Sequence, residues 1–274
     1  MLEIVILVVA SAVVLIGGTA LLMFFDVAFA TLRRRSATAD PGAFQLPLLR
    51  GEELRRWAKG MAERVVSKHA GRTRDKQSVL GIAVEVLDGT SGIIYEVTDR
   101  TDRPRSRAKS CSARRHEMTG VTAPEVLAIA DDLQRSHSKR EVDTIRARAR
   151  ENVQRASRLD HTQFPTSNLT CPLYTESGHC ATFGSRPLYC RGACPECREG
   201  DCRRESHDLP ALQAFATTVG EGMLDGLTTG LASAGLDNHV YELNSALSVA
   251  LSTPDAASRF ARGEAVFSGC KPYA

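Results

Sequence analysis

Aromatic residues are scarce in this chain of 274 residues, since Phe, Trp and Tyr together make up only 5% of it. Hydrophobic residues still account for 43% of the sequence, so its cores must consist mainly of Leu, Val, Ile and Ala. Large rings are among the residues that strands favour most, and a core with few of them is better suited to packed helices. We therefore expect a mainly helical protein.

Motifs for nucleotide binding and for nucleophilic catalysis are missing as well. The sequence has no glycine-rich phosphate loop and no dinucleotide-binding fingerprint after a strand. It has no Ser, His and acidic residue in a recognisable nucleophile motif, and it has no internal repeat. The formal net charge of +3 is too small to indicate a partner. None of these features favours a class of activity.

Charge is absent from residues 4–25, IVILVVASAVVLIGGTALLMFF. A helix of this length matches the hydrocarbon thickness of a bilayer, roughly 30 Å, so we predict a membrane span in contact with lipid. No Lys or Arg precedes the span and three arginines follow it at residues 33–35. The positive-inside rule then places the N-terminus outside and the rest of the chain in the cytoplasm. A cleaved signal peptide with an A-x-A site at residues 28–30 is the alternative, which the missing basic n-region disfavours.

Residues 1–30 are thus predicted as a transmembrane anchor and residues 31–118 as a basic juxtamembrane region and linker. A helix is expected over residues 52–69, with a basic face suited to anionic lipid head groups or to solvent. The apolar pattern of residues 79–87 predicts a second helix that ends at Asp88-Gly89. The segments GIAVEV and GIIYEV are rich in β-branched residues, so a β-hairpin remains an alternative. Residues 98–115 carry seven basic and two acidic residues without aromatics, which indicates a solvated linker and argues against nucleic acid as a partner.

Three further helices are predicted on either side of a cysteine-rich loop. Thr122 and Glu125 form a capping box that opens a helix through Leu133, and a very polar helix follows over residues 140–159. After the loop, Pro210 starts a helix with glycines at 222, 226 and 230. Each interior glycine costs a helix about 1 kcal/mol relative to alanine, so their spacing predicts another helix at close range.

The end of the chain, residues 208–274, is predicted as a small helical bundle. After the glycine-bearing helix, the apolar pattern predicts another helix over residues 239–251. A short third helix, capped by Thr253-Pro254, is expected to end at Ala261.

Six of the eight cysteines fall within 32 residues: Cys171, Cys180, Cys190, Cys194, Cys197 and Cys202. Thiolates are soft ligands that suit zinc and iron-sulfur clusters, and a reducing compartment disfavours disulfides. Pro, Gly and Ser interrupt the segment, so a metal would supply much of the folding energy of an irregular loop. We predict these six cysteines as ligands of zinc or of an iron-sulfur cluster. Among His116, His161, His179 and His207, the one beside Cys180 is best placed to add a nitrogen ligand.

The string CPLYTESGHCATFGSRPLYCR resembles the second half of the YkgJ-type cysteine-cluster family, described as zinc- or iron-chelating domains. The matching positions are Cys171-Pro172, Gly178, Cys180, Arg186-Pro187 and Cys190-Arg191, with nine residues between the second and third cysteines. The segment VTAPEVLAIADDL, which begins at Val121, is similar to the helix after that family's first cysteine group. The resemblance implies a YkgJ-like domain over residues 119–207.

One departure from the family pattern concerns the ligands. The family carries about four cysteines before that helix, whereas this chain has only Cys111 there. We therefore hypothesise that Cys194, Cys197 and Cys202, beyond the shared motif, replace them.

Together these features predict a membrane-anchored metal-binding protein of unassigned activity with a structural centre. Flagellin lysine methylases carry a similar cysteine cluster, so a metal-dependent enzyme of redox or methyl-transfer type is one alternative. The other is an exported domain with three disulfides, which requires the opposite topology. The sequence leaves a protein partner open.

Overall fold

The computed structural model describes residues 51–71, 74–99, 118–157, 163, 169–193 and 210–273. These belong to one compact unit, Leu49–Ala274. The predicted membrane span at 4–25, the first linker and most of the basic run at 98–115 lie outside the described residues. Over the residues described, the chain is mostly helical, as expected, with eight helices and one two-stranded sheet. The elements are α2 (Gly51–Ala70), α3 (Lys76–Asp99), β1 (Gly120–Thr122), α4 (Ala123–Ser136), α5 (Lys139–Ala156), α6 (Leu188–Ala193), α7 (Pro210–Ser233), β2 (Val240–Glu242), α8 (Leu243–Ala250) and α9 (Ala256–Ala261).

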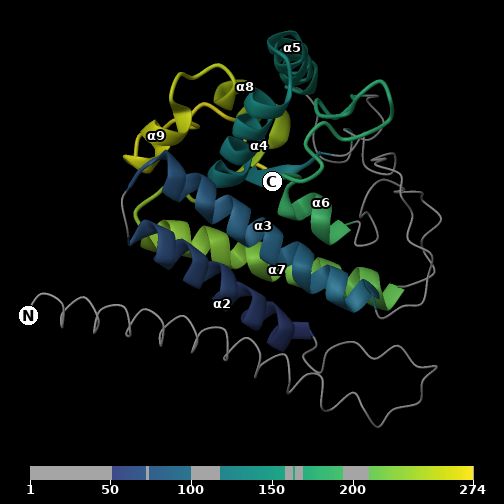
Figure 1. Ribbon diagram of the computed structural model, residues 1–274, viewed down its shortest axis with the longest axis vertical. Helices are drawn as coiled ribbons and strands as arrows, with labels where there is room; N and C mark the ends of the chain where they lie inside the picture. The colour runs from purple at the N-terminus through teal and green to yellow at the C-terminus, as the bar shows by residue number, and fades with distance from the viewer. Residues whose placement is uncertain are drawn as a thin grey trace, which may run out of the picture. The chain divides into compact units, whose positions relative to one another are not determined.

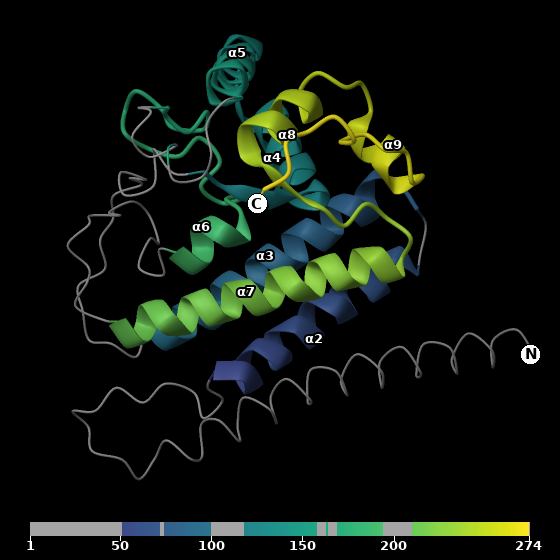
Figure 2. The same cartoon turned by 180° about the vertical axis from the view of Figure 1, so that it is seen from behind.

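Helix α2 forms where the sequence predicts it, and it runs beside α7 in the same direction (Figures 1 and 2). Acidic residues in its first turn and basic residues in its last turn suit the helix dipole. Its buried stripe recurs every four residues and meets the glycines of α7: Ala58 faces Gly222, Ala62 faces Gly226 and Val66 faces Gly230. The predicted close approach of a helix to these glycines is therefore confirmed.

An ion pair joins the two helices. Arg55 of α2 lies 2.7 Å from the carboxylate of Asp225 in α7 and 4.0 Å from that of Glu221. The two acidic residues that the sequence places on α7 thus have a cationic partner on its neighbour.

Helix α3 continues without interruption through Asp88 and Gly89, so the predicted end at that dipeptide is wrong, as is the hairpin alternative. The reason is tertiary burial, because the inward face continues beyond the glycine with Thr90, Ile94 and Val97. The hydroxyl of Thr90 donates to the carbonyl of Val86 at 2.7 Å and is thereby satisfied inside the core.

One described helix, α3, is long and apolar enough over Lys76–Val97 to cross a membrane by length and composition alone. Core helices of globular proteins can meet the same criterion. In this structure α3 packs against α2, α4, α7 and α9, which is the environment of a core helix.

Strand β1 pairs antiparallel with β2, with Gly120 opposite Glu242 and Thr122 opposite Val240. Each strand leads directly into a helix, β1 into α4 and β2 into α8. Residues 240–242 were expected to be helical, and that expectation is wrong because they pair with a strand about 120 residues earlier. Main-chain bonds from Tyr273 to Val240 and from Glu242 to Lys271 continue the pairing toward the chain end.

The predicted cap of the last helix is also wrong. Helix α9 begins at Ala256 and its N-cap is Asp255, whose φ of 51° lies in the left-handed region. Asp tolerates this conformation better than most residues, so the turn before α9 is made by Asp255 rather than by Thr253-Pro254.

Helices α4 and α5 both begin with capping boxes, in which the glutamate accepts bonds of the same length. Glu125 accepts hydrogen bonds from the amide and the hydroxyl of Thr122 at 2.8 and 2.7 Å, which confirms the predicted box. Glu141 accepts the equivalent two bonds from Ser138 at the same distances. The helices after residue 208 pack on earlier ones, α7 on α2, α8 on α4 and α5, and α9 on α3.

Candidate metal centre in the cysteine loop

The first part of the cysteine loop folds back on itself as a small hairpin. Tyr174 and Cys180 are antiparallel bridge partners, and the amide of Ala181 donates to the carbonyl of Leu173 at 2.8 Å. Gly178 lies at the turn with a φ of 84°, a conformation that glycine adopts without a steric penalty. The second cysteine is thus brought back beside the residues that follow the first.

The third cysteine, Cys190, lies on the short helix α6, which packs closely on α7. A Cβ on Gly220 of α7 would lie only 3.2 Å from the Cα of Gly192 in α6, so the two backbones are nearly in contact. The side chain of Gln213 also donates to the carbonyl of Gly192 at 3.0 Å. These contacts hold the end of the described loop on the helical core.

The start of α6 is held by a buried carboxylate of α4. Glu125, only 1% exposed, accepts a 2.8 Å hydrogen bond from the amide of Leu188 in addition to its capping-box bonds. Burial raises the pKa of Glu125, whereas the bonds from Leu188 and Thr122 and the charge of Arg191 oppose the shift. The capping box and the cysteine motif, which are distant in sequence, therefore meet in one buried contact.

Arg191, the arginine next to the third cysteine, stabilises the turn before α6 by hydrogen bonds. It is 4% exposed and donates to the carbonyls of Gly184 and Arg186 and to the hydroxyl of Ser91 in α3. Burial and repulsion from Arg186 lower the pKa of Arg191 to about 10, so it is protonated at neutral pH.

Arg186 is the second buried arginine of the motif. It is 7% exposed, and its guanidinium carbon lies 4.3 Å from the ring centroid of Phe183. Nη2 of Arg186 donates to the hydroxyl of Tyr95 in α3 at 3.4 Å. Both motif arginines thus anchor the loop to α3 by polar contacts.

Cys180, which is half-buried, lies beside polar groups. Burial raises the pKa of the Cys180 thiol, while the amide and hydroxyl of Thr182 and the charge of Arg186 lower it. Nδ1 of His179, the residue before Cys180, is buried without a hydrogen-bond partner among the described residues. The buried hydroxyl of Thr182 has the Cys180 thiol beside it. An unpaired buried polar atom is rare and costly, and this one adjoins a predicted ligand.

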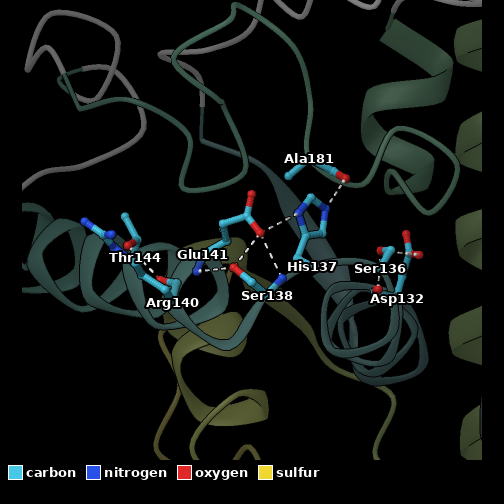
Figure 3. A network of polar contacts seen from close by, with 8 residues as sticks. All are labelled: Asp132, Ser136, His137, Ser138, Arg140, Glu141, Thr144 and Ala181. Atoms are coloured by element: carbon cyan, nitrogen blue, oxygen red, sulfur yellow. Dashed lines mark hydrogen bonds and ion pairs between the residues drawn. The ribbon is translucent and has the colours of Figure 1, made fainter.

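Residues at the corner between α4 and α5 contact the loop next to Cys180 (Figure 3). His137 donates from Nε2 to the carbonyl of Ala181 at 3.0 Å, and its Nδ1 lies 3.9 Å from the carboxylate of Glu141. Ser185 donates to Asp132 at 2.8 Å. Loop residues 181–185 are therefore attached to α4 and to its C-cap.

Two polar residues on the inner face of α5 hold the beginning of the loop. Arg148 donates to the carbonyl of Tyr174, and Asn152 donates to the carbonyl of Thr170 at 2.8 Å. Asn152 also donates to Asn244 of α8, so this contact reaches the C-terminal helices. None of these residues was predicted to contribute to the site. Arg148 and Asn152 are four residues apart and so share one face of the predicted helix, which was the sequence signal that could have indicated a common role.

The described residues include three of the six predicted ligands: Cys171, Cys180 and Cys190. Within the described ranges, no three His, Cys, Asp or Glu side chains form a group that could hold a metal ion. The other three predicted ligands, Cys194, Cys197 and Cys202, lie outside the described residues. So do Cys111 and three of the four histidines considered, His116, His161 and His207. The predicted ligand set remains a prediction.

Comparison of the chain with models of protein families, with curated proteins and with solved structures gives no match. The resemblance to the YkgJ-type family therefore rests on the motif positions alone.

Proposed function

We propose that this chain is a membrane-anchored metal-binding protein whose centre lies in the cysteine loop and has a structural role. The observation that supports this best is the unpaired, buried Nδ1 of His179 beside Cys180, in a loop whose described part polar contacts attach to α4 and to its C-cap. These contacts position the backbone of the described part of the loop, while that ring nitrogen lacks a partner among the described residues. A bound metal would complete the loop.

The proposed ligands are Cys171, Cys180 and Cys190, completed by cysteines at 194, 197 and 202. Thiolates of this kind suit zinc or an iron-sulfur cluster. When bound, a structural zinc ion supplies cross-linking energy that an irregular loop does not generate by itself. In this proposal the contacts of Arg186, Arg191 and His137 orient the loop backbone.

Metal analysis tests the proposal. The full chain is purified anaerobically in detergent, and zinc and iron are measured per chain for the wild type and for single Cys→Ser variants of the six proposed ligands. We expect metal in the wild type and a loss in Cys180→Ser. A brown protein with broad visible absorbance would identify an iron-sulfur centre, and a colourless zinc protein would support the structural role. Unchanged metal in all six variants would contradict the proposal.

Cys270 offers a matched control. It is buried, with 8% exposure, its thiol lies beside Ser245, and it stands outside the predicted ligand set. Cys270→Ser makes the same thiol-to-hydroxyl replacement as Cys180→Ser. We expect its metal content to equal that of the wild type.

The membrane part of the proposal places residues 4–25 in lipid, the N-terminus outside and the remainder in the cytoplasm. A reporter fused after Ala274 should be active only in the cytoplasm. Activity only outside would instead favour the exported, disulfide-bonded alternative.

A further inference from the structure

Glu125 connects the two segments on which the resemblance rests. Its Oε2 accepts bonds from the amide and hydroxyl of Thr122, at 2.8 and 2.7 Å, and so completes the cap of α4. Its Oε1 accepts the amide of Leu188, 63 residues later, at 2.8 Å. Since the side chain is only 1% exposed, water does not compete for these bonds. One carboxylate thus serves two helix starts.

The bond to Leu188 matters because α6 is short. Helix N-termini leave their first amides without partners inside the helix, and isolated helices well below about 12 residues are not stable in water. Helix α6 has six residues, and Cys190 is its third. Where α6 begins, and therefore where Cys190 projects, depends on what its first amide binds.

We infer that Glu125 is a positioning residue for the metal centre, because its bond to the Leu188 amide holds the helix that carries Cys190. The inference rests on the proposed function. Its distinct claim is that a residue of α4, outside the cysteine loop and with no ligand role, sets the affinity of the centre. Arg191, on α6 itself, holds the preceding turn by donating to the carbonyls of Gly184 and Arg186.

The chain contains a matched control for this residue. Glu141 forms a capping box with Ser138 at the same distances as Glu125 with Thr122. Among the contacts described, Glu141 makes none with α6 and reaches the loop only through His137. Replacing either glutamate by Gln leaves one oxygen acceptor in place of two. At Glu125 the one remaining oxygen can accept from Thr122 or from Leu188, but not from both. In the described part of the chain, Glu141 has no such second partner on α6.

The experiment compares the wild type, Glu125→Gln, Glu125→Asp and Glu141→Gln as full chains. Each is dialysed against rising EDTA concentrations, the zinc and iron retained per chain are measured, and circular dichroism reports helix content. We expect both Glu125 variants to lose metal at about tenfold lower EDTA than the wild type, the lower end of the range for residues that orient ligands. Glu141→Gln should retain metal like the wild type.

Glu125→Asp keeps the charge but is one methylene shorter, so its carboxylate cannot reach Thr122 and Leu188 together; it is the second test if Glu125→Gln does not fold. A folded Glu125→Asp with wild-type retention would overturn the inference and leave the proposed function intact. Equal losses in Glu141→Gln would also overturn it, since capping alone would then explain the effect. Absence of metal from the wild-type protein would refute both the inference about Glu125 and the proposed function.

Discussion

The carbonyl oxygen of Lys59 in α2 occupies the space in which a Cβ on Gly226 of α7 would lie. This is a contact between two backbones, so no side chain can rotate to relieve it. Gly222 meets the carbonyl of Arg55 in a similar way. The helices can approach this closely only because α7 carries glycine at these positions.

Gly226→Ala should therefore destabilise the protein, although alanine favours helices. Overpacking costs about 1–3 kcal/mol, and a rigid backbone obstacle places this site at the upper end. The free energy of unfolding in urea measures the loss. Gly92→Ala in α3 is the control, because a Cβ there meets no atom within 4 Å. It should stabilise by about 0.5–1 kcal/mol, and a stabilising Gly226→Ala would show that α2 and α7 do not pack as described.

Arg191→Lys should loosen the cysteine loop even though the positive charge is kept. An ammonium group cannot reproduce the planar fork that reaches two carbonyls and the Ser91 hydroxyl. We expect a loss of about 2 kcal/mol in unfolding free energy, since hydrogen bonds with a charged partner contribute about 1.5–3 kcal/mol. Faster proteolysis within residues 171–187 should accompany it.

Arg155→Lys provides the comparison for that substitution. Arg155 is exposed and lies 3.7 Å from Glu151 on the same helix, so the replacement should change stability by less than about 0.5 kcal/mol. If both lysine variants behaved alike, the clamping role of Arg191 would be refuted.

The contact between α2 and α3 should weaken in acid. Partial burial alone would raise the pKa of Glu85, but hydrogen bonds from Lys68 and His69 outweigh it and lower the pKa below the ordinary 4.5. A lowered carboxylate pKa stabilises the folded state above the ordinary value, and this contribution is lost as pH falls below about 4.5. Thermal unfolding of Glu85→Gln should therefore show a shallower loss of stability in this acid range.

The loss of stability in acid due to Glu85 should be under about 1 kcal/mol, because the ion pair of Lys68 and Glu85 is partly exposed. Glu53→Gln, on the exposed side of α2, should keep the wild-type pH profile. A Glu85→Gln profile identical to the wild type would mean that the bonds to Lys68 and His69 contribute nothing to stability.

Local signals in the sequence predicted much of the helical structure. The capping box of Thr122 and Glu125 predicted the start of α4, and the four-residue glycine spacing predicted a helix in contact with α7. Both signals depend on residues within one or two turns of each other, so no knowledge of the fold was needed.

The errors arose where distant partners decide the structure. Gly89 does not end α3, because burial of Thr90 and Ile94 continues its inner face. Residues 240–242 form a strand because β1 pairs with them, and a short segment shows no such preference alone. The bond between Glu125 and Leu188 spans 63 residues. The sequence placed Glu125 in a capping box and Leu188 between motif positions, but it contained no sign that the two residues touch.

The parallel pairing of α2 and α7 constrains how the protein can be made. Arg55 and Asp225 are 170 residues apart, so during synthesis the apolar stripe of α2 emerges long before the glycines that cover it. Contacts of such long range slow folding, and uncovered apolar surface promotes aggregation meanwhile. A nascent chain that stops before α7 would expose this stripe, so successful folding depends on protecting α2 until the last quarter of the chain has been synthesised.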